Sequence, residues 1–184
     1  MLVERTSTPA RRITLADAKS QLNVLTTRDD DYITRLVNIA EESIMDRSNK
    51  VFSEATFKFT FYDVSGKVMF PRYPVYNSET SPITSVKGTT EENGTLVDLV
   101  EGVNYYIADN SIIIMDNECY TTLEVVTPCG YNDEDWSEAK GLEGCVLMMI
   151  GELYANRQSS IASVVTAIPY GIEFMLAPNC YVYQ

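Results

Sequence analysis

The sequence contains no histidine, and this absence excludes several kinds of chemistry. Ser-His-Asp and Cys-His catalysis both need an imidazole, and so does every metal site with histidine ligands. The four cysteines form no Cys-x-x-Cys pair and are interpreted as free thiols. No apolar run approaches the roughly 20 residues of a membrane-spanning helix, and residues 1–12 do not resemble a signal peptide. We therefore expect no membrane segment, no metal site and no cofactor.

Basic residues are missing from a long stretch in the middle of the chain. The 184 residues include 14 Lys plus Arg and 26 acidic residues, for a net charge of −12, and no basic residue lies between Lys87 and Lys140. Such a stretch repels phosphates, so we expect no grip on nucleic acid. It is either a solvated face that keeps the protein soluble or a surface that DNA passes without sticking. The acidic surface is predicted at Glu91, Glu92, Asp133, Glu134 and Asp135.

Two helices are predicted near the start of the chain. Thr14 followed by Asp17 is a short variant of the capping box, which predicts a helix from Leu15 to about Val24. A second helix should follow the aspartates at 29–31, because apolar residues recur at helical spacing up to residue 44. The aspartates are interpreted as helix-capping residues, since the glycine and glutamate of a calcium-binding loop are absent.

The middle of the chain changes to the period of a β-strand. Phe57, Phe59 and Phe61 alternate with polar residues, and short apolar runs between turn residues predict about six strands over 56–130. Helical spacing returns after Trp136. The predicted fold class is α+β, a helical bundle of N- and C-terminal helices with an inserted small antiparallel β lobe and an extended C-terminal tail. The predicted parts are a flexible arm (1–12), a helical domain (13–55 and 136–160), an inserted acidic β lobe (56–135) and a docking tail (161–184).

The last 27 residues are unusually poor in charge. From Gln158 to Gln184 the only charged side chain is Glu173, and several aromatic residues are present. A solvated terminus of this composition is unfavourable. The residues alone leave two possibilities open: the segment folds back onto its own core, or it docks on another subunit.

Five segments also follow one another in a characteristic order. Residues 13–19 and 30–33 look like two opening helices, and residues 83–87 look like part of a β insertion. Residues 152–157 look like the end of a long helix, and 168–173 like a C-terminal motif. In this order the chain resembles the head–tail connector (adaptor) proteins of long-tailed bacteriophages, specifically the longer members with an inserted β lobe.

The resemblance implies a structural virion protein without enzymatic activity or catalytic residues. Its subunits would be made in the host cytoplasm and would form a homo-oligomeric ring, commonly twelve-fold, below the portal protein at the neck of the virion. Tail-proximal neck or stopper proteins would lie beyond it, and genomic DNA would pass through without specific binding during ejection. The C-terminal segment would engage the portal, with the alternative that Phe174 and Leu176 complete the monomer's own core. The docking candidates are Ile168, Pro169, Tyr170, Ile172, Phe174, Leu176 and Tyr181.

Other functions are weighed against this hypothesis. The unbroken acidic stretch also fits an acidic DNA mimic that inhibits a nucleic-acid-binding protein. Such a mimic has no need for an apolar tail, so it ranks second. An enzyme that acts through carboxylates would require a cleft, which a sequence does not reveal.

Overall fold

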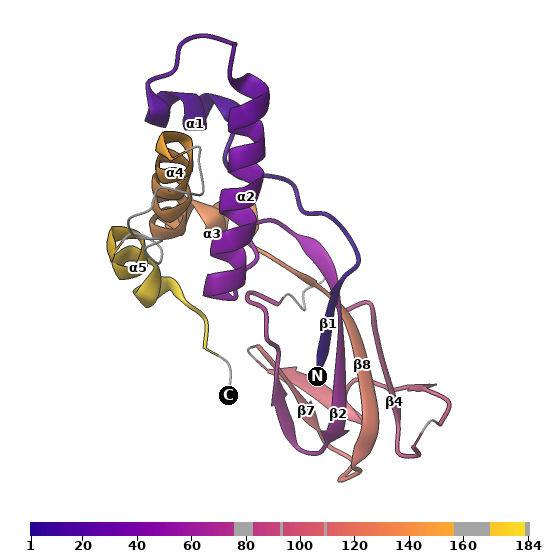
Figure 1. Ribbon diagram of the computed structural model, residues 1–184. Coiled ribbons are helices and arrows are strands. Elements are labelled where there is room, and N and C mark those ends of the chain that lie inside the picture. Colours follow the sequence, from indigo (N-terminus) through magenta and orange to yellow (C-terminus); the bar gives the residue numbers. More distant parts are fainter. Residues whose placement is uncertain (76–82, 93, 109, 157–169, 183–184) are drawn as a thin grey trace, which may run out of the picture. The chain divides into compact units, whose positions relative to one another are not determined.

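The computed structural model describes residues 1–75, 83–92, 94–108, 110–156 and 170–182 (Figure 1). The chain divides into two units that are each built from separate segments. We call Arg11–Phe52 together with Asp133–Tyr181 the helical unit, and Met1–Ala10, Ser53–Asn132 and Val182–Gln184 the β unit. The predicted boundaries at 55/56 and 135/136 lie three residues further along the chain than the observed ones. The mixed α+β class is confirmed.

The helical unit is organised around two long helices, α2 and α4, which contact each other along their length (Figure 1). The helix α1 packs against both of them, and α5 packs against α4. Their apolar faces are buried, including Ile33, Ile44 and Ile150 at 0% exposure. The helices are α1 (Leu15–Leu22), α2 (Asp30–Ser48), α3 (Asp133–Glu138), α4 (Lys140–Ala155) and α5 (Tyr170–Leu176), followed by the 3-10 helix η1 (Ala177–Asn179).

The first helix begins as the sequence predicts. The Thr14 side chain accepts a hydrogen bond from the Asp17 backbone N–H at 3.1 Å, and the Asp17 carboxylate accepts one from the Thr14 N–H at 3.1 Å. The helix ends at Leu22, two residues earlier than predicted, because Asn23 adopts a left-handed conformation with φ 55°. Asn49 ends α2 in the same way, with φ 56°.

Asp29 does not cap α2 in the predicted way. It stands at the N-cap of α2 but makes no capping hydrogen bond with its side chain. Its carboxylate instead accepts a hydrogen bond from the Tyr154 hydroxyl at 2.7 Å, which ties the start of α2 to the end of α4. Residues 133–135, predicted as acidic surface, form the first turn of α3.

The β unit contains two antiparallel sheets. One has the strand order β1-β2-β8-β4-β5, and the other has the order β3-β7-β6. The sequence predicts about six strands over 56–130, where the described residues form seven, and the N-terminal segment adds an eighth. These are β1 (Leu2–Arg5), β2 (Ala55–Val64), β3 (Lys67–Met69), β4 (Ser85–Thr89), β5 (Val97–Asp98), β6 (Tyr105–Ala108), β7 (Ser111–Ile114) and β8 (Tyr120–Cys129).

The prediction of a flexible arm over residues 1–12 is wrong. Leu2–Arg5 pairs with β2 in antiparallel register, and the Thr6 N–H extends the pairing by donating to the Thr56 carbonyl at 2.9 Å. Further along, the backbone N–H groups of Arg12 and Ile13 are bound by the side chain of Glu41. Both ends of this segment are therefore held by contacts that lie far away in sequence.

The core of the β unit lies between its sheets. Phe57, Phe59 and Phe61 point to one face of the five-stranded sheet and stack in a row, with ring centroids 6.0 and 6.3 Å apart. Phe70, directly after β3, packs against Phe59 at 5.4 Å. The fully buried Ile112 of β7 belongs to the same core. The alternation read from the sequence therefore sets which face of β2 is buried.

Candidate functional site

The C-terminal segment is part of the helical unit. Ile172 and Leu176 lie four residues apart on the same side of α5, and both are buried. The Cys145 thiol of α4 donates to the Ile172 carbonyl at 3.9 Å. A Cβ added to Gly144 of α4 would come within 2.9 Å of the Met175 methyl group, so the two helices approach closely. Ile172 and Leu176 complete the core of their own unit, which corrects their prediction as docking residues.

The chain after α5 is also fixed to the helical unit. The Tyr181 backbone N–H donates to the Ser48 carbonyl at 2.7 Å, and the Tyr181 carbonyl accepts a hydrogen bond from the Asn49 side chain at 3.1 Å. Glu173 forms a half-exposed ion pair with Arg47 at 3.5 Å. Backbone hydrogen bonds of Tyr181 thus fix the end of segment 170–181 to the end of α2. Because these bonds use the backbone, they leave side chains of the segment free to face solvent.

Phe174 is the large apolar side chain that this segment presents to solvent. It lies two residues after Ile172, on the opposite side of α5, and is 79% exposed. Tyr181 is half-buried. Ile168 and Pro169 lie outside the described residues, as does the side chain of Tyr170. Of the predicted docking residues, Phe174 and Tyr181 remain as candidates that the structure places within reach of a partner.

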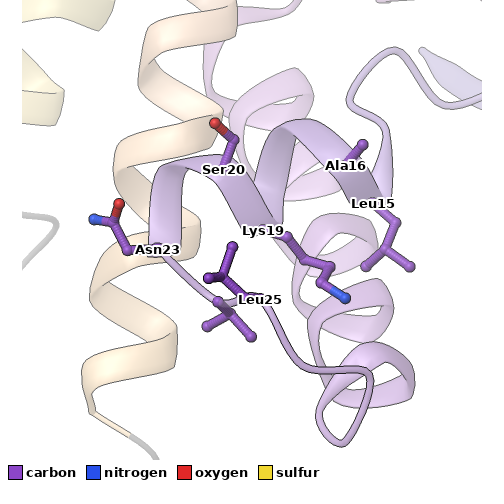
Figure 2. A pocket seen from close by; sticks show the side chains of 7 residues that line it. Leu15, Ala16, Lys19, Ser20, Asn23 and Leu25 are labelled. Carbon is purple, nitrogen blue, oxygen red and sulfur yellow. The ribbon is translucent and has the colours of Figure 1, made fainter.

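A second apolar surface lies beside α1. A hollow of about 700 Å³, here called the α1 groove, is lined by α1 and the segment that follows it. Figure 2 shows Leu15 and Lys19 pointing from α1 toward the segment that carries Leu25, whose side chain is 96% exposed. Lys19 is held at the groove by an ion pair with Asp30 at 2.6 Å. The α1 groove is lined by Leu15, Ala16, Lys19, Ser20, Asn23, Val24 and Leu25.

The sequence does not reveal a polar cluster that fixes the entry to α1. Glu41 of α2 is 1% exposed, and its carboxylate accepts hydrogen bonds from the Arg12 N–H at 2.9 Å and the Ile13 N–H at 2.7 Å. The Arg11 guanidinium pairs with the same carboxylate at 3.3 Å. We call this arrangement the Glu41 clasp. A signal was present, because Glu41 lies between Ala40 and Ile44 on the apolar stripe of α2.

Arg12 joins three elements of the helical unit. Its guanidinium donates to the Phe52 carbonyl at 2.8 Å and forms an ion pair with Asp133 of α3. It also lies over the Trp136 ring, 5.7 Å from the centroid, in a cation–π arrangement. Trp136 in turn packs on Phe52 at 4.9 Å. Asp133 is therefore part of a structural junction, although the sequence places it on an acidic surface.

The predicted acidic residues are divided between the two units. Glu91 and Glu92 are exposed in the β unit, after β4, whereas Asp133 and Asp135 are exposed in α3 of the helical unit. The Glu134 side chain lies outside the described part. By sequence, the β unit holds 12 acidic and 5 basic residues, for a net charge of −7, and the helical unit holds 14 and 9, for −5. The negative charge thus belongs to both units.

Charged side chains of the β unit form a row across the five-stranded sheet. Glu4 is in register with Lys58, and Lys58 forms an ion pair with Glu124 at 2.8 Å. Glu124 is in register with Lys87, which pairs with Asp98 at 3.4 Å. We call these five residues the charge row, because their signs alternate from β1 to β5. Two residues of the acidic stretch are therefore balanced by lysines from neighbouring strands.

Two titratable side chains of the β unit, Tyr120 and Asp116, are hydrogen-bonded to each other. The Tyr120 hydroxyl donates to Asp116 at 2.6 Å. Burial and this hydrogen bond raise the pKa of Tyr120 to about 12. Burial alone would raise the pKa of Asp116, but hydrogen bonds from Tyr120 and Asn104 outweigh it and lower that pKa. Asp116 is therefore firmly ionised at neutral pH.

Neither unit offers a recognisable catalytic or metal-binding arrangement among its described residues. Within that part of the chain, no three cysteine, aspartate or glutamate side chains gather as metal ligands would. All four cysteines are free thiols, and burial raises the pKa of Cys129 and Cys145. None of the described helices is both long and apolar enough to cross a membrane.

A known family model matches part of the chain. Residues 12–93, from the Glu41 clasp into the β unit, match the family described as "Phage gp6-like head-tail connector protein". Over that part of the chain, the match confirms the resemblance read from the sequence. No curated protein matches the chain.

Solved structures with the same fold come from gene transfer agent (GTA) particles. A chain from the neck of an empty GTA particle, computed with C6 symmetry, aligns with a TM-score of 0.75 at 15% identity. A chain from the virion of a native GTA particle gives 0.74, and one from the native neck, computed with C12 symmetry, gives 0.71, both at 15% identity. Each alignment covers 99% of this chain and 96% of the other. At this identity the likeness shows the shared fold.

Proposed function

We propose that this chain is a subunit of a head–tail connector ring, which joins a capsid to a tail and lets DNA pass. The observation that carries the proposal is the family match at residues 12–93, together with a fold shared over 99% of the chain with a neck protein. The function is structural and involves no catalysis. The symmetries of the related necks, C6 and C12, support a ring, for which we propose twelve copies.

Ring closure requires two different faces on each subunit that fit one another. The α1 groove of the helical unit is our candidate for one of these faces. We assign the exposed Phe174 of α5, together with the half-buried Tyr181, to contact with the portal rather than to the ring. A rigid backbone anchor and an outward aromatic ring suit a docking contact, since aromatic anchors dominate the energetics of interfaces.

The passage of DNA fits the charge of both units. With net charges of −7 and −5, neither unit would hold the phosphate backbone. The alternative function of a DNA mimic is weakened by the charge row, because a mimic needs unpaired negative charge and Lys58 and Lys87 lie among these acids. We therefore retain the connector ring as the proposed function and set the DNA mimic aside.

Imaging of purified particles by electron microscopy tests the connector role. We expect density for this fold at the junction of capsid and tail, repeated around the axis. If particles contain the chain elsewhere, or lack it, the proposal is overturned.

Portal docking is tested with Phe174→Ser. We expect about a tenfold or greater loss of binding to the purified portal, as for a central aromatic anchor, with an unchanged unfolding temperature because Phe174 is exposed. Tyr62→Ser, which changes an exposed aromatic residue of β2 that is 54% exposed, provides a matched control that should bind normally. Deletion of the whole tail is unsuitable, because it would remove the buried Ile172 and Leu176 as well. Equal binding by wild type and F174S would refute the docking assignment.

A further inference from the structure

The five-stranded sheet ends at β5 with backbone groups that face outward. Among the described strands, β5 pairs with β4 alone. The Leu99 N–H donates to the Val86 carbonyl at 2.9 Å, so Leu99 turns its backbone groups toward β4. Because these groups alternate along a strand, the N–H and carbonyl of Asp98 point to the open edge of the sheet. Backbone groups at an open edge can pair with a further extended segment.

The open edge of β5 is short. At its far end, the Val100 N–H donates to the Asn104 side chain at 2.9 Å, and the Val100 carbonyl accepts a hydrogen bond from the Asn104 N–H at 2.9 Å. These bonds occupy the next outward-facing backbone groups. An edge of this length suits one short segment and does not support the continued stacking of strands.

A hollow of about 370 Å³, here called the β5 hollow, lies beside this edge, and Val97 and Leu99 contribute to its lining. Val97 is in register with Gly88, and Gly88 with the buried Leu123, so Val97 lies on the apolar face of the sheet. Even so, Val97 is 63% exposed. Residues that lie opposite each other in paired strands share a face of the sheet. A residue of a paired segment opposite Val97 would therefore lie over the β5 hollow.

The edge of β5 is also acidic. The charge row ends at Asp98, whose side chain is 78% exposed although it pairs with Lys87 at 3.4 Å. Glu91, which lines the β5 hollow, and Glu92 are exposed in the connection between β4 and β5. The signs alternate from strand to strand along the row, and opposite charges stabilise neighbouring strands. A strand added beyond Asp98 is therefore best complemented by a basic side chain.

We propose that the edge of β5 binds an extended segment of a different protein, in which a Lys or Arg lies opposite Asp98 and an apolar residue lies opposite Val97. Main-chain hydrogen bonds would hold the segment, and these two side chains would select it. The other open edge of the same sheet, β1, ends the charge row with Glu4, which has the same sign as Asp98. The two edges of the sheet thus do not complement each other, and ring closure can use other faces.

Titration with a designed peptide tests this inference. The isotope-labelled full chain is mixed with the capped peptide Thr-Val-Lys-Val-Thr, and its amide signals are followed by NMR. We expect the signals of Asp98 and its neighbours along β5 to shift. A peptide with Glu in place of Lys should bind about tenfold more weakly at low salt, and the difference should shrink at high salt. N-methylation of the lysine N–H, which removes the bond to the Asp98 carbonyl, should also weaken binding about tenfold.

A pair of variants tests the same contact from the side of the protein. Asp98→Pro removes the outward N–H, and proline is tolerated at the open edge of a sheet. We expect this variant to lose binding of the lysine peptide without a lower unfolding temperature. Asp98→Asn is the matched control, because it keeps the N–H and should lose only the salt-dependent part of the binding. If D98P does not fold, the N-methylated peptide makes the same test on the wild type.

The outcomes that would overturn the inference are distinct from those that bear on the connector role. They are the absence of shifts along β5, equal binding of the lysine and glutamate peptides at low salt, and full binding by the N-methylated peptide. Shifts of the same amides with protein concentration alone would place a second copy at the edge and would also overturn it. Imaging of particles tests the connector role separately.

Discussion

The helical unit keeps a charged group in its interior, whereas the β unit displays charged groups across an open sheet face. In the Glu41 clasp, one buried carboxylate binds two backbone N–H groups and the Arg11 guanidinium. In the charge row, five residues on five strands share the interactions, and the side chain of Asp98 is largely exposed while that of Lys87 is partly exposed. The difference predicts how each unit responds to the loss of one charged side chain. In the helical unit the charged contacts meet at the single side chain of Glu41, whereas in the β unit they are spread over five residues.

Removal of the clasp should give the largest effect on stability. Glu41→Ala leaves the N–H groups of Arg12 and Ile13 without their acceptor and removes one of the two carboxylate partners of Arg11. We expect a loss of about 3–5 kcal/mol in the free energy of unfolding, as for a broken buried pair. Chemical denaturation, followed by circular dichroism, measures it.

The neighbouring residue provides the control for the clasp. Glu42 also pairs with Arg11, at 3.3 Å, but its side chain is partly exposed. Glu42→Ala should therefore cost less than about 1 kcal/mol. Similar losses for the two variants would show that the clasp has no special role.

The buried side of α5 should give the next largest effect. Ile172→Ala creates a cavity against α4 and should cost about 2–4 kcal/mol. Phe174→Ala, on the opposite side of the same helix, should change stability by no more than about 0.5 kcal/mol. Thermal unfolding of both variants compares them. If F174A were as unstable as I172A, the assignment of the two sides of α5 would be wrong.

These two positions also show how far the sequence predicts the molecule. Local sequence signals predict correctly those features that depend on one helix or strand alone. The capping box at Thr14 marks the start of α1, and the alternation at Phe57–Phe61 identifies the buried face of β2. Local signals do not decide the chain ends, where a distant element determines the outcome. Leu2–Arg5 is too short to stand out as a strand until β2 pairs with it. Ile172 and Phe174 are both apolar, and only packing on α4 distinguishes the buried one from the exposed one.

The candidate site follows the same rule. Glu91 and Glu92, which the sequence assigns to an acidic surface, are exposed. The sequence does not show that Lys58 lies against Glu124, since strand register brings together residues 66 positions apart.

The hydrogen bond between Tyr120 and Asp116 should give a smaller effect, and it depends on pH. Tyr120→Phe removes the bond and should cost about 1 kcal/mol at neutral pH. Because the folded-state pKa of Tyr120 is raised to about 12 from an ordinary 10, its stabilisation is complete below pH 10 and is lost as the pH rises from 10 to 12. The variant should lack this loss. Denaturation at pH 8 and pH 11 measures it, and an identical decline in wild type and Y120F would contradict the assignment.

The charge row should give the smallest effect, and the effect should depend on salt. Lys87→Gln removes a pair whose partners are both well exposed, so the cost should be below about 0.5 kcal/mol and should vanish at 1 M salt. Lys58→Gln affects the more protected pair with Glu124, and it should cost somewhat more at low salt. Denaturation at low and high salt compares the two variants. In a distributed row, one substitution removes only one weak contact. If Lys87→Gln lowered the free energy of unfolding as much as Glu41→Ala does, the stability of the β unit would depend on a single charge, as in the helical unit.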